Sequence, residues 1–163
     1  MKHLYAPWRG SYTKKAADQT HLKHGCPFCT IIESKNDAEN YVIKRYASCT
    51  VLLNTFPYNP GHLLIIPNAH LPQLHDLDDA TRHELMDVIT SSTRILTDAL
   101  ACHGTNVGIN LGGEAAGGSI PEHLHVHVAP RWKGDTNFMP VIAETKQISE
   151  DLNTVYAALK TKF

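Results

Sequence analysis

The sequence predicts an α+β fold built on an antiparallel sheet. Short segments rich in apolar and β-branched residues follow one another through turn signals, which is typical of neighbouring antiparallel strands. One long stretch between them has the period of an amphipathic helix, so the pattern differs from the regular alternation of a βαβ protein. With 163 residues, the chain is long enough for one compact domain with a sizeable core.

The first half of the chain predicts an arm, a short helix and two strands. Residues 1–25 are polar and irregular, and we expect them to form an arm across the surface. PFCTIIESK (27–35) is a helix candidate with Pro27 near its start, where the missing N–H does no harm. SCTVLLNTF (48–56) and HLLIIP (62–67) are predicted as strands, joined by the turn residues of FPYNPGH.

The second half begins with the main helix. Apolar residues recur at helical spacing from about Asp78 to Cys102, and acidic residues, Asp78 and Asp79, favour the N-terminal end. Gly104 suits the position just after the helix, where a left-handed residue is common. NVGINLG (106–112) then returns to a strand pattern.

The last predicted elements are a strand with strict alternation and a C-terminal helix. HLHVHVAPR (123–131) alternates histidines with apolar residues, and we expect the strand to end at Pro130. Apolar residues between 152 and 159 mark the final helix, with Ser149 as its candidate N-cap.

The composition argues against several kinds of partner. The formal net charge is −1, which disfavours binding of nucleic acid or an anionic membrane but leaves a small nucleotide open. The start MKHLYAPWRGSYTKK has no apolar signal-peptide core, and no apolar run is long enough to span a membrane. We therefore expect a cytoplasmic protein. Histidine is the unusual residue, with 11 copies.

Three histidines share one face of the predicted strand. Alternate residues of a strand point the same way, so His123, His125 and His127 lie opposite an apolar row that must face the core. An exposed face that happens to carry histidine is one interpretation, and a zinc site is another, because two of these histidines could share a metal. The third is phosphate chemistry, in which a neutral imidazole attacks phosphorus while its neighbours orient it or hold developing charge.

The loop before these histidines favours phosphate chemistry. NLGGEAAGGS (110–119) is rich in glycine, which lets backbone N–H groups approach an anion closely. Ser119 adds a hydroxyl group and Asn110 adds an amide. A flexible hairpin connection would explain a glycine-rich loop by itself. It would not explain why the loop leads directly to three histidines on one face of a strand.

These motifs resemble the histidine triad (HIT) superfamily. SIPEHLHVHVAPR matches its signature of three histidines alternating with apolar residues, and NPGHLLIIPNAH resembles the block in which a fourth histidine follows a glycine. HLYAPWRGSY, CPFC and PRWKGDTNFMPVIAET are similar to the branch of diadenosine tetraphosphate phosphorylases and fragile-histidine-triad-like hydrolases. The resemblance covers nearly the whole chain. It implies a single HIT domain over residues 1–163, with an antiparallel sheet of about five strands, one main helix and a C-terminal helix.

The resemblance also implies a covalent mechanism. His125 would attack the α-phosphorus of a dinucleoside polyphosphate and form a nucleotidyl-histidine intermediate, with its tautomer fixed by a backbone carbonyl. Water or orthophosphate would then resolve the intermediate, and phosphorolysis is slightly favoured. His127 and His62 would contact the phosphate or hold His125. Asn54, in a VLLN segment that resembles a family strand, would bind the ribose.

The same resemblance assigns the loop to the phosphate oxygens, with Asn110, Gly117, Gly118 and Ser119 as contacts. Many family members carry glutamine or a similar residue where this chain has Gly118. This departure favours the phosphorylase-like branch. A nucleoside phosphoramidase and a zinc-stabilised nucleotide-binding module with little turnover are the alternative functions. A homodimer is implied by the resemblance alone.

The CPFC motif allows three interpretations. A catalytic dithiol would normally follow a buried strand, which THLKHG does not provide, and two unrelated thiols are also possible. Structural zinc fits better, because Cys26 and Cys29 supply two thiolates and such a site needs two more ligands. The resemblance implies that these are His70 and His123. The alternative ligands are His21, His24 and His75.

Overall fold

The computed structural model describes residues 25–112, 116, 118–136 and 148–163. The predicted N-terminal arm therefore lies outside the described residues, except for Gly25. All described helices and strands belong to one compact unit, Cys26–Trp132 with Ile148–Phe163. In chain order the elements are α2 Pro27–Glu33, β1 Val42–Arg45, β2 Cys49–Leu53, β3 Leu63–Pro67, the 3₁₀ turn η2 Leu74–Asp76, α3 Asp79–Leu100, β4 Gly104–Ile109, β5 Val126–Arg131 and α5 Leu152–Lys160.

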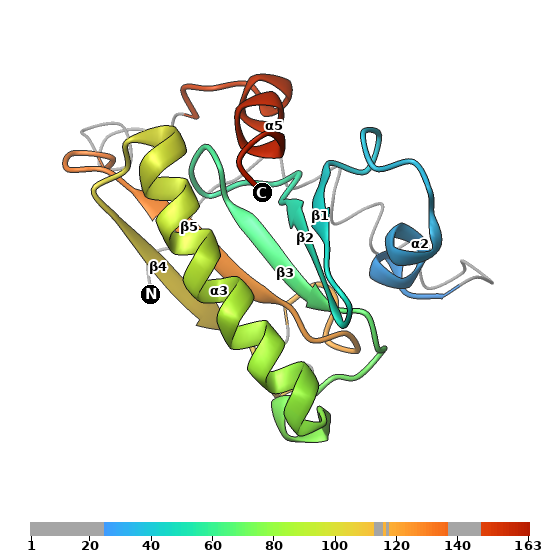
Figure 1. The fold of residues 1–163 in the computed structure, drawn as a ribbon. Helices are drawn as coiled ribbons and strands as arrows, with labels where there is room; N and C mark the ends of the chain where they lie inside the picture. The colour runs from blue at the N-terminus through green and yellow to red at the C-terminus, as the bar shows by residue number, and fades with distance from the viewer. Residues whose placement is uncertain (1–24, 113–115, 117, 137–147) are drawn as a thin grey trace. The chain divides into compact units, whose positions relative to one another are not determined.

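The strands form one antiparallel sheet in the order β1-β2-β3-β5-β4. Helix α3 runs obliquely across one face of this sheet (Figure 1). The short helix α2 packs against residues of β1, β2 and β3. The α+β class, the five-stranded antiparallel sheet, the main helix and the C-terminal helix are thus confirmed.

The sheet has a large core on one face and a small one on the other. Sixteen buried residues, including the inward faces of α3 and α5, form the larger cluster. The apolar row of the histidine segment, Leu124, Val126 and Val128, belongs to this cluster as expected. Six buried residues form the smaller cluster around α2. His127 pairs with Leu64 of this smaller cluster, so its side chain lies on the α2 side of the sheet.

One strand was missed, and two expectations about helix ends were wrong. Strand β1 was not predicted, because its four residues include the charged pair Lys44 and Arg45 and give too short a pattern. The N-cap of α5 is Asp151, not Ser149, because the Asp151 carboxylate accepts from the backbone N–H groups of the first turn. Helix α3 ends in a left-handed Ala101, and Gly104 instead opens β4.

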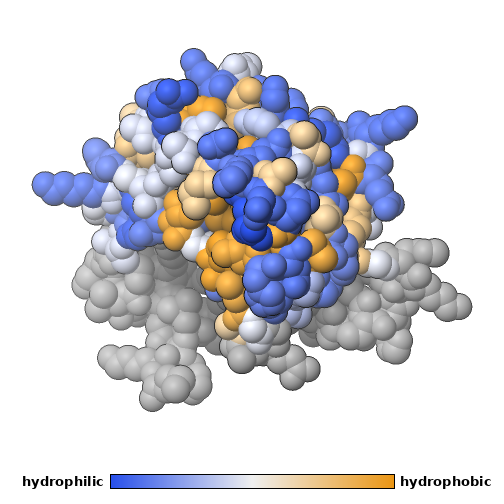
Figure 2. All heavy atoms as spheres, turned by 60° about the horizontal axis from the view of Figure 1, so that its bottom comes forward, coloured by the Kyte–Doolittle hydropathy of each residue, from blue (hydrophilic) through white to orange (hydrophobic). Residues whose placement is uncertain are grey.

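Six large hydrophobic side chains of the described residues are exposed on the surface. On the face drawn in Figure 2, hydrophobic residues gather in a band between hydrophilic ones. In the part of the chain that the structure describes, no helix has the length and hydropathy needed to cross a membrane. The most exposed large hydrophobic residues of that part are Phe56, Tyr58, Met86, Val107, Leu111 and Ile148.

Candidate functional site

The three triad histidines are not all in a strand. β5 begins only at Val126, so His123 and His125 precede it, although the sequence pattern predicts a strand from 123. The backbone explains the late start, because the N–H of Leu124 donates to the carbonyl of Leu71 instead of joining the β3–β5 ladder. Ladder pairing with β3 starts at Val126. The segment before it can therefore turn its histidines toward separate surroundings.

His123 joins two cysteines and a fourth ligand-type side chain. The ligand atoms of Cys26, Cys29, His70 and His123 all lie within 4.8 Å of one another. The Sγ–Nδ1 distance is 3.3 Å both between Cys26 and His123 and between Cys29 and His70. A tetrahedral zinc ion with ordinary bond lengths would separate sulfur and nitrogen ligands by about 3.5 Å. The structure thus brings together the four expected ligands with a spacing that fits zinc.

The second nitrogen of His123 supports the same interpretation. Its Nε2–H donates to the carbonyl of Pro67 at 2.9 Å, so Nδ1 keeps its lone pair on the side of the two sulfur atoms. Burial raises the pKa of the Cys26 thiol to about 11. A catalytic dithiol needs a lowered thiol pKa, so the raised pKa of Cys26 disfavours a redox role. Among the alternative ligands, His21 and His24 lie outside the described residues, and His75 is exposed beside Asp76.

His125 has one nitrogen bonded to the backbone. Nδ1–H of the buried imidazole donates to the carbonyl oxygen of His123 at 2.8 Å, so Nε2 carries the lone pair. The ring packs against Phe28 and His127, with centroid distances of 5.2 and 5.1 Å. The backbone therefore fixes the tautomer in which Nε2 can act as a nucleophile.

His62 fixes the tautomer of His127. The backbone N–H of Tyr58 donates to Nδ1 of His62 at 3.2 Å, so this nitrogen is unprotonated. Burial, followed by the neighbouring His127, lowers the pKa of His62 to about 3, and the neutral ring must then carry its proton on Nε2. That N–H donates to Nδ1 of His127 at 3.0 Å.

The proton of His127 must therefore sit on Nε2. Burial and the nearby His125 lower the pKa of His127 to about 4, so this ring is also neutral near pH 7. Nε2 is buried and has no hydrogen-bond partner among the described residues. A buried N–H without a partner is costly, and an anionic oxygen would satisfy it. The arrangement offers a hydrogen-bond donor on a ring that packs against the ring of His125.

The expected ribose and phosphate residues are only partly brought together. The Asn54 side chain lies at the end of β2, 3.3 Å from Nδ1 of His62, and accepts from the N–H of Phe56. Asn110 directly follows β4, whose last residue pairs with the first residue of β5. Gly118 has a φ of +68°, and a Cβ there would lie 3.9 Å from the Asn110 amide nitrogen. Ser119 is exposed, and Gly117 lies outside the described residues.

Two aromatic residues of the site were not predicted from the sequence. Phe28, between the two cysteines, packs against both His123 and His125. The ring centroids of Tyr58 and His62 are 4.6 Å apart, and the Tyr58 ring stacks on that of His127 with an interplanar angle of 18°. The sequence did indicate these residues in one way, since each lies within four residues of a predicted site residue. Spacing along the chain, however, cannot predict a contact with a histidine that is distant in the sequence.

The fold and this arrangement of histidines define a histidine triad protein. The family model described as HIT domain matches residues 35–134, which is more than half of the chain. The chain therefore belongs to the HIT family.

Relatives with named activities include enzymes. AP-4-A phosphorylase of Mycobacterium tuberculosis (strain ATCC 25618 / H37Rv) is 38% identical over 167 aligned positions, covering all of this chain and 85% of the relative. The asymmetrical bis(5'-nucleosyl)-tetraphosphatase of Schizosaccharomyces pombe is 35% identical over 105 positions, covering 63% of this chain and 55% of the relative. A Zn-bound histidine triad family protein from Mycobacterium smegmatis has a similar structure, with a TM-score of 0.68, 27% identity, and coverage of 85% of this chain and 92% of that one. The chain is therefore classed with the HIT-type enzymes.

Proposed function

We propose that this chain cleaves dinucleoside polyphosphates through a covalent intermediate on His125. The observation that carries the proposal is the pair of fixed tautomers, which gives His125 a lone pair on Nε2 and His127 a proton on Nε2. A nucleophile beside a donor for phosphate oxygens is what displacement at phosphorus requires. The full-length similarity to an AP-4-A phosphorylase supports this substrate class.

The reaction would proceed in two displacements. His125 Nε2 attacks the α-phosphorus, the phosphoanhydride bond to the leaving nucleotide breaks, and that nucleotide departs with the bridging oxygen. His127 Nε2–H donates to a phosphate oxygen, and Asn54 binds the ribose. The oxygen of orthophosphate or water then attacks the same phosphorus and frees His125. We favour orthophosphate, because a relative that aligns along the whole chain is a phosphorylase. Fixing the imidazole beside the substrate makes the attack effectively unimolecular.

The products of diadenosine tetraphosphate test this proposal. We expect ADP and ATP, formed only when orthophosphate is present, and no turnover in a His125→Asn variant that still binds the nucleotide. AMP and ATP without orthophosphate would show that water resolves the intermediate. No cleavage by the wild-type protein, or an active His125→Asn variant, would contradict the proposal. Phosphoramidase activity or binding without turnover would then be the function to examine.

We further propose that a structural zinc ion occupies the four-ligand cluster. The ligand spacing and the Zn-bound family member support this assignment. We expect about one zinc ion per chain by elemental analysis, and its loss in a Cys29→Ser variant. A Cys102→Ser variant, changed at a buried cysteine outside the cluster, is the control and should keep its zinc. Wild-type protein without zinc would overturn the assignment.

We propose a homodimer, with the edge strand β4 as one part of its interface. Among the described strands, β4 lies at the edge of the sheet, and Val107 on it is 46% exposed. An unprotected edge strand readily pairs with a second strand. A mass of one chain by sedimentation equilibrium would contradict this proposal.

A further inference from the structure

Helix α2 is short and packs on the smaller of the two apolar clusters. It contains seven residues, of which Phe28 is buried and Cys29, Ile31 and Ile32 are partly buried against that cluster. A helix this short is not stable on its own in water. The cluster has six buried residues, against sixteen on the other face of the sheet. The position of α2 therefore depends also on the polar contacts at its two ends.

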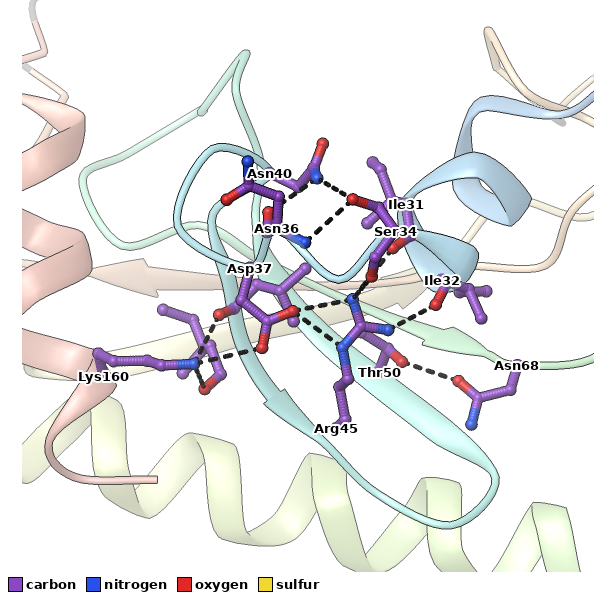
Figure 3. Close-up of polar contacts among 12 residues, drawn as sticks. Ile31, Ile32, Ser34, Asn36, Asp37, Asn40, Arg45, Thr50, Asn68 and Lys160 are labelled. Carbon is purple, nitrogen blue, oxygen red and sulfur yellow. Dashed lines mark hydrogen bonds and ion pairs between the residues drawn. The ribbon is translucent and has the colours of Figure 1, made fainter.

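Arg45 of β1 holds the C-terminal end of α2 (Figure 3). Its guanidinium donates to the backbone carbonyl groups of Ile32 at 2.7 Å, Ile31 at 3.1 Å and Ser34 at 2.8 Å. It also donates from Nε to the Asp37 carboxylate at 2.9 Å. The last carbonyl groups of a helix have no partners within the helix and carry partial negative charge, so a planar cation satisfies both needs.

The other end of α2 carries the metal-ligand cysteines. Cys26 is the N-cap residue and Cys29 lies in the first turn. Arg45 and the Cys/His cluster thus hold opposite ends of one short helix. The Arg45 contacts and the Cys/His cluster cannot replace each other, because each constrains only one end of α2.

Phe28 links the position of α2 to the catalytic imidazole. Its ring lies 5.2 Å from that of His125 and 5.5 Å from that of His123, measured between centroids. The Phe28 ring is 5% exposed, so it cannot shift without disturbing both imidazoles. A displacement of α2 is therefore transmitted to His125.

We propose that Arg45 is a positioning residue for His125, acting through helix α2 and Phe28. This inference rests on the proposed function for its kinetic readout, but its structural readout does not. Loss of the guanidinium releases the C-terminal end of α2, and Phe28 no longer confines the His125 ring. Small misplacements of reacting groups are costly to rate, so the effect falls on kcat.

The test compares Arg45→Met with Lys160→Met in the zinc-loaded protein. Lys160 is the matched control, because it lies 3.8 Å from the same Asp37 carboxylate but donates to carbonyl groups of Val42 and Ile43 instead of α2. We expect Arg45→Met to lower kcat about tenfold with little change in KM. Lys160→Met should retain wild-type kcat.

The second readout is the NMR signal of the His125 ring protons, which the Phe28 ring current shifts. We expect the signal to move in Arg45→Met in the same direction as in Phe28→Leu, which removes the ring current entirely, but by a smaller amount, and to stay unchanged in Lys160→Met. If Arg45→Met does not fold, Arg45→Lys replaces it, because it keeps the charge and loses the planar fork. Unchanged signals and kcat in the Arg45 variant would overturn the inference. Absence of turnover in the wild type would count against the proposed function alone, since the NMR comparison still decides the role of Arg45.

Discussion

At the scale of the residue, the histidines of the site differ in which nitrogen carries the proton. His125 is protonated on Nδ1 by its bond to a carbonyl, whereas His123 and His62 are protonated on Nε2 by their partners. His127 is also protonated on Nε2, because its Nδ1 accepts the hydrogen bond from Nε2–H of His62. In the proposed function, one residue type therefore supplies a metal ligand, a nucleophile and a hydrogen-bond donor, and the hydrogen-bond partners of each ring set its tautomer.

This assignment predicts the nitrogen chemical shifts of the histidine rings. Long-range proton–nitrogen NMR at pH 7 should show a protonated Nδ1 for His125 and a protonated Nε2 for His62 and His127. Replacing His62 by Phe removes the donor to His127, so the His127 ring should then exchange between its two tautomers. A His75→Phe variant, changed at an exposed ring, should leave these signals as they are. A protonated Nδ1 on His127 in the wild type would contradict the assignment.

At the scale of the element, the sequence predicted most strands and helices but not how they divide the site. The alternation in HLHVHV correctly placed its apolar row in the core. It could not reveal that β5 starts at Val126, because that depends on a hydrogen bond from Leu124 to the distant Leu71. Arg45 was missed for the same reason, since its partners lie on α2 and are not marked by any local pattern.

In the turn before β3, replacement of one glycine should clearly lower the stability of the fold. Gly61 has a φ of +80°, and a Cβ there would clash with the Leu100 side chain at the end of α3. Gly61→Ala should therefore lower the free energy of unfolding by about 1–3 kcal/mol, through backbone strain and overpacking. Gly104→Ala is the control, because its Cβ would meet no atom within 4 Å. Equal urea midpoints for the two variants would contradict the prediction.

At the scale of the whole molecule, the two faces of the sheet serve different needs. The larger cluster joins α3, α5 and the sheet and supplies most of the buried apolar area. The opposite face carries the Cys/His cluster that could hold a metal ion and the neutral, buried imidazoles. Burying a titratable group in its neutral form ties the stability of the fold to pH.

The buried imidazoles predict how stability depends on pH. The pKa of His62 falls from 6.5 to about 3 in the folded protein, and that of His127 falls from 6.5 to about 4. Because the unfolded chain binds these protons more readily, the stability is fully present above pH 6.5 and is lost as the pH falls toward 4. Each ring contributes a slope of up to about 1.4 kcal/mol per pH unit in this window.

Urea unfolding between pH 7 and pH 5 measures this dependence. Replacing His62 by Gln removes one buried titrating ring, so the free energy of unfolding should vary less steeply with pH than in the wild type. His75→Gln, at a side chain that is 81% exposed, should keep the wild-type slope. Release of zinc at acid pH should affect all three proteins alike. The difference between their slopes therefore measures the contribution of the His62 ring to the pH dependence of stability. A His62→Gln variant with the wild-type slope would show that the imidazole of His62 is not held neutral by the fold.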